Sequence, residues 1–232
     1  MSESISNSIN GSMNSIVNER VSSFIRSFYP DDEGFLRELY ASAKERRIPV
    51  IREDTRELFR LLLSMKKPGR ILEIGTAVGY SALLMHSCCP KASITTMELD
   101  SERIGEARTN FEQCGALAST EEEGKILLLE GDAAELLKSL SGVYDFIFVD
   151  AAKAQYLTYL QELLRLSESG TVILSDNVLQ EGNILESHFS VEKRDRTIHD
   201  RMREYLFKIT HTEELTTSIL PVGDGVAVTY VS

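Results

Sequence analysis

The chain has 232 residues and a formal net charge of −11 at pH 7, because 36 Asp and Glu outnumber 25 Lys and Arg. A hydrophobic content of 42% and a charged content of 26% are typical of a globular protein with one large or two small domains, and they exclude a largely disordered chain. The acidic balance argues against a protein that binds nucleic acid over its whole surface.

The N-terminal segment carries no targeting signal that we can identify. Residues 1–14 are rich in Ser and Asn and predict a disordered tail. The first 19 residues contain no Lys or Arg and no apolar run, and no segment reaches the roughly 20 apolar residues of a membrane span. Cys88, Cys89 and Cys114 have no metal-ligand spacing and fit reduced thiols. We therefore expect a cytoplasmic protein that makes no membrane contact.

Residues 15–68 predict N-terminal helices that precede the main domain. Apolar side chains recur at helical spacing from Val17 to Phe28, a second helix follows Pro30, and a third spans 53–65. The sequence Ile-Pro-Val-Ile at 48–51 predicts an extended joint between the second and third helices.

Residues 69–232 predict an α/β domain, because short apolar runs alternate with helical patterns. The runs that predict strands are 71–74, 93–99, 125–130, 144–150 and 171–176. The helical patterns are 79–88, 101–116, 133–141, 154–167 and a last one that ends near 211. Buried strands separated by helices indicate βαβ units and a parallel sheet. Two final strands, 215–220 and 225–231, are joined by a short turn and are expected to be antiparallel at a sheet edge.

Acidic residues end or directly follow each of the five predicted parallel strands. They are Glu73, Glu98, Asp132, Asp150 and Asp176. Ligands of open parallel sheets bind outside the carboxyl ends of the strands, so we expect these side chains to line one rim that receives a cationic or hydroxylated ligand. Acids also cap helix N-termini, and this alternative suits Asp132 best.

A glycine-containing turn, GTAVG at 75–79, follows the first strand. Such a turn lets the backbone approach a ligand closely, although glycine can equally serve a tight loop. The pattern departs from the dinucleotide motif GxGxxG, because Ala77 replaces its second glycine. Glu98 suits the hydroxyls of a ribose, so the two features together favour a nucleoside ligand. The lack of a GxxxxGK[ST] motif argues against a triphosphate.

Asp150, Asp176 and Asn177 form the sharpest candidate site, at the ends of neighbouring predicted strands. Two carboxylates and an amide oxygen are hard donors that suit Mg²⁺, Mn²⁺ or Ca²⁺ rather than Zn²⁺. Lys153 lies at the start of the helix after Asp150, where a nearby dication would lower its pKa and fit it to act as a general base. A structural salt bridge between these acids and Lys153 is the alternative.

At these residues the sequence resembles the class I S-adenosylmethionine-dependent O-methyltransferases, and within them the divalent-metal branch that includes catechol and caffeoyl-CoA O-methyltransferases. The segments that carry the resemblance are EIGTAVGYS (73–81), MELD (97–100), EGDA (130–133), FVDAAK (148–153), SDNVL (175–179) and PVGDG (221–225). The resemblance implies a Rossmann-like doubly wound sheet of seven strands in the order 3-2-1-4-5-7-6, with the last strand antiparallel. It also implies a homodimer, which the apolar helix from Val17 to Phe28 could form.

The same resemblance implies a role for each matching residue. The residues implied to bind S-adenosylmethionine are Ile51, Glu73, Gly75, Gly79, Ser81, Glu98, Asp132, Ala133 and Asp150. A divalent metal, with Mg²⁺ as the first choice, is implied at Asp150, Asp176 and Asn177, and Lys153 is implied as the catalytic base. The metal would bind two neighbouring oxygens of the acceptor and lower the pKa of the one that attacks the sulfonium methyl.

The identity of the methyl acceptor is the most specific of the sequence predictions. The IPVI joint, DAAKAQY (150–156) and NVLQEG (177–182) resemble the bacterial tRNA 5-hydroxyuridine methyltransferases, whose acceptor is the wobble base in the tRNA anticodon region. In 5-hydroxyuridine the O5 hydroxyl adjoins the O4 carbonyl and can chelate a metal as a catechol does. We therefore predict this tRNA base as the acceptor, with a small catechol or phenol as the alternative. A nucleoside- or RNA-binding module without catalysis is the alternative of a different class.

Two groups of basic residues are candidates for phosphate contacts with such an RNA. The first group is Lys44, Arg46, Arg47, Arg52, Arg56 and Arg60, and the second is Lys193, Arg194, Arg196, Arg201 and Arg203. The residues predicted to contact RNA are Arg46, Arg47, Lys193, Arg194 and Arg196. Solvated helix faces with local ion pairs are the alternative. Tyr156 and Phe189 are candidates either for stacking on a base or for core packing.

Overall fold

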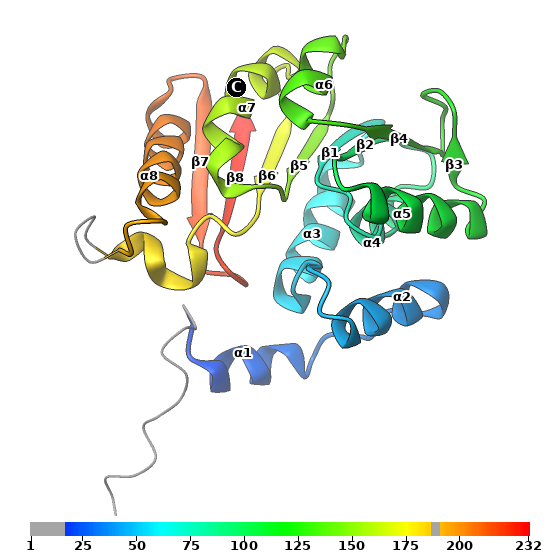
Figure 1. Ribbon diagram of the computed structural model, residues 1–232, viewed down its shortest axis with the longest axis horizontal. Coiled ribbons are helices and arrows are strands. Elements are labelled where there is room, and N and C mark those ends of the chain that lie inside the picture. The colour runs from blue at the N-terminus through cyan, green and yellow to red at the C-terminus, as the bar shows by residue number, and fades with distance from the viewer. Residues whose placement is uncertain (1–16, 187–190) are drawn as a thin grey trace, which may run out of the picture.

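A computed structural model describes residues 17–186 and 191–232, and its centre is one twisted sheet with helices on both faces (Figure 1). The predicted tail, 1–14, and Phe189 lie outside the described residues. The strands are β1 (Arg70–Ile74), β2 (Ser93–Glu98), β3 (Leu117–Ala118), β4 (Ile126–Glu130), β5 (Phe146–Val149), β6 (Val172–Ser175), β7 (Leu215–Leu220) and β8 (Val226–Val231).

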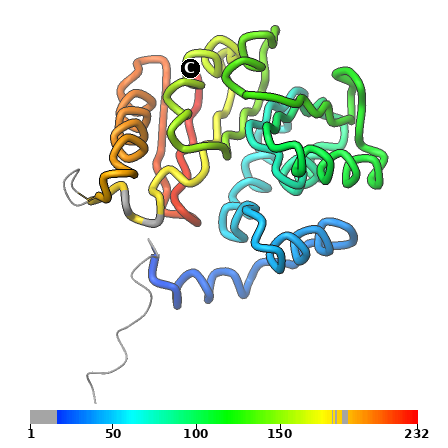
Figure 2. The backbone as a smooth tube through the Cα atoms, in the orientation of Figure 1, coloured from blue at the N-terminus to red at the C-terminus, as the bar shows by residue number. Residues whose placement is uncertain are grey.

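The strand order is β3-β4-β2-β1-β5-β6-β8-β7. The β6–β8 and β7–β8 pairs are antiparallel and the other neighbouring pairs are parallel. When the short strand β3 is left out and the remaining strands are numbered in chain order, the order is 3-2-1-4-5-7-6. This confirms the predicted order and the antiparallel last strand. Figure 2 shows the C-terminal strand running between β6 and β7. The short edge strand β3 was not predicted, because two residues are too few to give an apolar run.

The helices form two layers on the sheet. Their bounds are α1 (Glu19–Arg26), α2 (Gly34–Glu45), α3 (Glu53–Lys66), α4 (Tyr80–Cys88), α5 (Ser101–Gln113), α6 (Ala133–Ser139), α7 (Tyr156–Arg165) and α8 (Arg196–His211), with 3₁₀ turns η1 (Lys153–Gln155) and η2 (Gln180–Leu185). Buried side chains of α3, α4 and α5 pack with Ile71, Phe146 and Phe148 on one face, and those of α6, α7 and α8 pack with Leu72 and Ile147 on the other. Alternate strand residues thus face opposite layers, as in a doubly wound fold.

The N-terminal helices differ in how firmly they join this core. Phe59 and Leu63 of α3 are fully buried against the sheet. Helix α2 packs on α4, whereas α1 has no buried residue and exposes Phe24. The predicted joint at 48–51 is present as the non-helical link between α2 and α3. In the described part of the chain, no helix combines the length and the apolar character needed to cross a membrane.

Candidate active site

The carboxyl ends of the parallel strands border two adjoining cavities, at the place where the strand order reverses on either side of β1. Their volumes are about 650 Å³ and about 250 Å³. Gly75, Glu98, Asp150 and Ala151 line both cavities, which makes them neighbouring parts of one crevice. Open α/β sheets bind ligands in this position.

Seven of the nine residues predicted to bind a cofactor line this crevice. They are Ile51, Gly75, Ser81, Glu98, Asp132, Ala133 and Asp150. The larger cavity is bordered by Asp132 and Ala133 at the start of α6, and the smaller by Ile51 and Ser81. Glu73 and Gly79 do not line either cavity.

The two glycines of the β1–α4 turn are required for different structural reasons. A Cβ on Gly75, whose φ is +99°, would lie 1.9 Å from the Asp150 carbonyl oxygen, so glycine is required for the turn to meet the end of β5. A Cβ on Gly79, whose φ is +85°, would lie 2.5 Å from the Phe111 ring. Gly79 therefore lets α4 pack on α5, and its predicted contact with a cofactor has no counterpart in the cavity lining.

Glu73 does not lie on the expected rim, so that prediction is wrong for this residue. The residue is the last but one of β1, and its fully buried side chain lies on the same face of the strand as Ile71. Thr96 Oγ1 donates to Glu73 Oε2 (2.5 Å) and lies 2.5 Å from Thr76 Oγ1, which reaches the smaller cavity. Oε1 has no hydrogen-bond partner within the described residues. Burial raises the pKa of this carboxyl to about 7, although the Ser81 and Thr96 hydroxyls act in the opposite direction.

Glu98 and Asp132 both accept hydrogen bonds from nearby backbone N–H groups, and both border the crevice. Glu98 accepts hydrogen bonds from three backbone N–H groups, of Ala77 (2.8 Å), Leu99 (2.9 Å) and Asp100 (3.0 Å). Two of these bonds go to Oε1 and one to Oε2, so they fix the carboxylate at the cavity wall and leave an acceptor site on Oε2. Asp132 caps α6 by accepting from the Ala134 N–H (2.7 Å), as the capping alternative expects.

The structure brings Asp150, Asp176 and Asn177 together at the ends of β5 and β6. Asn177 Nδ2 donates to Asp150 Oδ1 (3.1 Å), and the Asn177 backbone N–H donates to Asp176 Oδ1 (2.8 Å). Asn177 has a φ of +59°, a left-handed conformation that asparagine adopts more readily than most residues. No three His, Cys, Asp or Glu side chains of the described chain form a metal site by themselves, so a cation here would depend on the Asn177 amide as its third donor.

The electrostatics of this cluster fit a cation. Burial raises the pKa of the Asp176 carboxyl well above its usual range, and the neighbouring Asp150 raises it further. Burial likewise raises the pKa of Asp150, against the effects of Asn177 and Lys153. Neither carboxylate forms an ion pair with a described Lys, Arg or His. A buried and a half-buried carboxylate with hard oxygen donors match the needs of a divalent metal.

Lys153 lies in η1, directly after the Asp150 loop, and is partly exposed. It forms no ion pair with Asp150 or Asp176, so the salt-bridge alternative is not what the structure contains. Its charge nevertheless lowers the pKa of Asp150, although Lys153 does not line either cavity.

Tyr156 belongs to the core, so the expectation that it could stack on a base is wrong. The side chain is 1% exposed, and its hydroxyl is shared between the carbonyl oxygens of Asp176 (2.8 Å) and Val149 (3.1 Å). The ring meets Tyr205 edge to face at 5.5 Å. Tyr156 therefore fixes the ends of β5 and β6, the two strands that present the acidic cluster.

Asp224 was not identified by the sequence analysis as a site residue, and Arg52 was identified only as a member of the first basic group. The β7–β8 turn is held beside the cluster because the Val178 and Leu179 N–H groups donate to Gly225 O (2.9 Å) and Asp224 O (3.1 Å). Asp224 raises and Arg52 lowers the pKa of Asp176, and the two form an ion pair at 2.7 Å. The PVGDG segment was the only available signal, and it gave no role to either side chain.

The basic residues predicted to contact RNA are largely engaged within the protein. Arg46 forms a bidentate pair with Glu106 (2.7 and 2.8 Å). Arg194 lies 3.1 Å from Glu192 and 3.5 Å from Asp195, and Arg196 donates to Val191 O (3.2 Å). The local excess of positive charge is therefore smaller than the sequence indicates.

Comparisons with known proteins agree with this geometry. The O-methyltransferase family model matches residues 27–231. A catechol O-methyltransferase of Niastella koreensis is 33% identical over 137 residues, which are 57% of this chain and 59% of that protein. A caffeoyl-CoA O-methyltransferase of Stellaria longipes is 28% identical over 216 residues, which are 86% of this chain and 84% of that protein. The solved structure of the SAH-bound methyltransferase PaMTH1 from Podospora anserina has a TM-score of 0.79 and 27% identity, and it covers 92% of this chain and 94% of its own.

Proposed function

The chain belongs to the O-methyltransferase family, as an S-adenosylmethionine-dependent enzyme of the catechol and caffeoyl-CoA type, and we propose that it methylates one of two neighbouring oxygens on a small aromatic acceptor. The observation that carries the proposal is the convergence of Asp150, Asp176 and Asn177 beside the crevice, with the charge of Lys153 lowering the pKa of Asp150. A catechol offers two adjacent oxygens to such a site, whereas a lone hydroxyl offers one.

The adjoining cavities are the proposed position of S-adenosylmethionine. Glu98 keeps an acceptor site on Oε2 for a ribose hydroxyl, and Asp132 and Ala133 border the larger cavity where the base would lie. Ser81, Thr76 and the backbone of Gly75 border the smaller cavity, which would take the amino-acid end. In this placement the sulfonium would lie where the two cavities adjoin, a place that Asp150 borders.

The acidic cluster is the proposed metal site. Asp150, Asp176 and the Asn177 amide oxygen would hold a divalent cation, with Mg²⁺ the first candidate, which when bound supplies a Lewis acid that lowers the pKa of an acceptor hydroxyl. Lys153 accepts the hydroxyl proton. Tyr156 keeps the two strand ends in register, so the acceptor oxygen and the methyl group are aligned before transfer.

Space for the rest of the acceptor supports a small molecule. A further cavity of about 420 Å³ lies between α1, α3 and the β7–β8 turn, with Ile25, Leu58 and Val222 among its lining residues. Arg52, the partner of Asp224, also lines it and so connects it to the acidic cluster. An aromatic ring held at the cluster can extend its substituents into this space.

The tRNA wobble base is the competing acceptor. Its chelating oxygens suit the same cluster, but the relatives named above are described as acting on catechol or caffeoyl-CoA, and Arg46 and Arg194 lie beside acidic residues. These observations favour the small acceptor.

The test is methyl transfer from S-adenosylmethionine by the purified chain. Transfer to catechol is expected, with loss in EDTA and recovery when Mg²⁺ is added in excess. The same assay is run on tRNA that contains 5-hydroxyuridine. A higher kcat/KM for that tRNA than for any catechol would overturn the small acceptor in favour of the RNA, and EDTA-resistant transfer would remove the metal.

A homodimer is part of the proposal. Val21, Phe24 and Phe28 of the α1 region are 47%, 65% and 69% exposed, which is unusual for large apolar side chains in a monomer. Sedimentation equilibrium is expected to give a dimer for the native chain and a weaker one for Phe24→Ser. A monomer at micromolar concentration would contradict it.

A further inference from the structure

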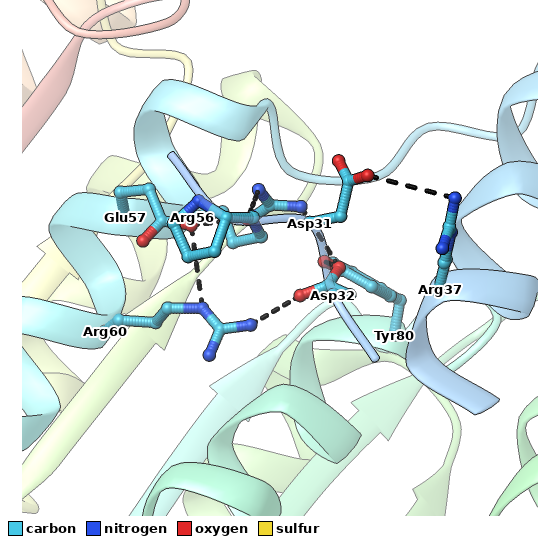
Figure 3. A network of polar contacts seen from close by, with 8 residues as sticks. Asp31, Asp32, Arg37, Arg56, Glu57, Arg60 and Tyr80 are labelled. Atoms are coloured by element: carbon cyan, nitrogen blue, oxygen red, sulfur yellow. Dashed lines mark hydrogen bonds and ion pairs between the residues drawn. The ribbon is translucent and has the colours of Figure 1, made fainter. Parts of the chain in front are cut away.

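A buried aspartate in the α1–α2 connection contacts two different helices (Figure 3). Asp32 is 4% exposed, although Asp31 and Glu33 on either side of it are exposed. The Tyr80 hydroxyl, from the first turn of α4, donates to Asp32 Oδ2. Arg56 of α3 donates to the same oxygen (3.1 Å), and Arg60 of α3 donates to Oδ1. We call Asp32, Arg56, Glu57, Arg60 and Tyr80 the Asp32 network.

The charges of the Asp32 network balance, and its hydrogen bonds are strong ones. Arg56 Nε donates to Glu57 Oε1 (2.9 Å), and Arg56 also reaches the Pro30 carbonyl oxygen (3.2 Å). Two guanidinium groups thus face two carboxylates. Bonds between ionised groups stabilise more than neutral ones, and removal of one partner leaves the others buried and unpaired. The network is therefore a fixed joint between the N-terminal connection, α3 and α4.

The start of α4 and the segment that leads into α3 both border the smaller cavity. Residues 49–51, directly before α3, form one side, and Tyr80 and Ser81 at the start of α4 form another. Asp32 does not line the cavity. The Tyr80 ring also packs on Tyr40 of α2, with centroids 5.1 Å apart. The separation of these two cavity walls thus depends on contacts made outside the cavity.

We propose that Asp32 is a positioning residue for the cofactor: through Tyr80, Arg56 and Arg60 it sets the spacing of α3 and α4 at the smaller cavity. This inference rests on the proposed placement of S-adenosylmethionine in the adjoining cavities. Asp150, Lys153 and Asp176 lie on other elements, so loss of the joint weakens cofactor binding and leaves the chemical step intact. The N-terminal connection is then part of the cofactor site without touching the cofactor.

Tyr80→Phe tests the proposal, because it removes one hydroxyl and keeps the ring. The Kd for S-adenosylhomocysteine, measured by calorimetry, and the KM for S-adenosylmethionine are expected to rise roughly tenfold, as for the loss of a hydrogen bond to a charged group. We expect kcat at saturating cofactor, and KM for the acceptor, to stay within about twofold of the native values.

Tyr144→Phe is the matched control. Tyr144 is also 1% exposed and donates to a carboxylate that an arginine holds, Glu121 (2.8 Å), but it precedes β5, at the amino ends of the parallel strands, whereas the crevice lies at their carboxyl ends. This control is expected to lower the unfolding temperature without changing the Kd. Equal Kd changes in both variants, or an unchanged Kd in Tyr80→Phe, would overturn the proposal. A native chain that binds no S-adenosylhomocysteine would instead overturn the cofactor placement itself.

Asp32→Asn changes the acceptor of the same hydrogen bond, whereas Tyr80→Phe removes its donor. Asn has one acceptor oxygen and places an N–H₂ group towards a guanidinium, so the Kd is expected to rise by at least as much as in Tyr80→Phe. In the double variant the Kd is expected to match that of Asp32→Asn alone, because both changes break one joint. Fully additive effects on the Kd would show that Tyr80 and Asp32 act separately and would contradict the proposal.

Discussion

Two groups of buried and half-buried aspartates in this chain have opposite electrostatic surroundings. Asp32 is enclosed by two arginines and a tyrosine hydroxyl, all contributed by α3 and α4. Asp150 and Asp176 lie beside each other with backbone and amide N–H donors, and no described cation forms an ion pair with either. Burial costs a carboxylate several kcal/mol unless a positive charge compensates it.

The difference separates a structural cluster from a functional one. The Asp32 group is complete within the chain, so its geometry is fixed by folding. The Asp150–Asp176 pair has no ion pair with a described cation, and it lies beside a crevice. Buried acids alone do not indicate a site, whereas buried acids that lack protein cations do.

The largest effect is expected from Asp176→Asn, which removes one negative charge from the uncompensated pair. Turnover should fall at least about 1000-fold, because the change removes a metal ligand and with it several kcal/mol of charge stabilisation. The metal-free variant should at the same time unfold at a higher temperature than the native chain, because one buried like charge is gone. Activity assays with added Mg²⁺ and calorimetry of the EDTA-treated proteins check both; a lower unfolding temperature would contradict the comparison.

Lys153→Ala removes the cation nearest to Asp150 without touching its hydrogen bonds. A general base contributes roughly 10²–10⁴-fold, so we expect kcat to fall by about 1000-fold and the Kd for S-adenosylhomocysteine to stay unchanged. Lys138→Ala on α6, which pairs with Glu135 at 2.8 Å, is the matched control and should keep native turnover. Native kcat in Lys153→Ala would remove the residue from the reaction.

Asp32→Asn should have the opposite effect on stability from Asp176→Asn. It leaves Arg56, which is 5% exposed, without its buried partner, a change that costs about 3–5 kcal/mol of unfolding free energy. Urea unfolding of the variant and the native chain at neutral pH measures this difference in unfolding free energy. If both asparagine variants shifted stability in the same direction, the contrast between the two clusters would be lost.

The smallest effect is expected from Glu73→Gln, and it depends on pH. The pKa of Glu73 is raised to about 7 in the folded chain, so between pH 4.5 and 7 the unfolded state loses its proton first and stability falls as the pH rises. Glu73→Gln has no carboxyl at this position and so does not lose stability in this range. Its free energy of unfolding should exceed that of the native chain by up to about 3 kcal/mol at pH 8, with no difference below pH 4.5. Unfolding of the cofactor-free proteins across this pH range measures the difference, and a gain that does not change with pH would exclude Glu73 as its source.

The sequence was sufficient for the elements and for the acidic cluster. Strands and helices followed from apolar periodicity, and Asp150 and Asp176 met because the ends of adjacent parallel strands share one edge. Only β3, which pairs two residues with β4, had no local signal. The family resemblance supplied the strand order, which the structure confirms.

The side chains that depend on distant partners could not be predicted in this way. Glu73 and Glu98 lie on the same face of the sheet, yet one is enclosed and the other borders the crevice, because Glu73 pairs with Thr96 and Glu98 lies two residues further along, at the end of β2. Asp224 lies beside the acidic cluster because backbone hydrogen bonds hold the β7–β8 turn against residues 178 and 179.

The sequence by itself determined which residues form strands, helices and caps, since those depend on neighbours a few positions away. Tertiary structure alone decided which buried charges are compensated: Asp32 meets Arg56 and Tyr80 across 24 and 48 residues, while Asp150 and Asp176 meet each other. The free energy of a buried charge depends on every charge within a few ångströms, and only the folded chain sets those distances.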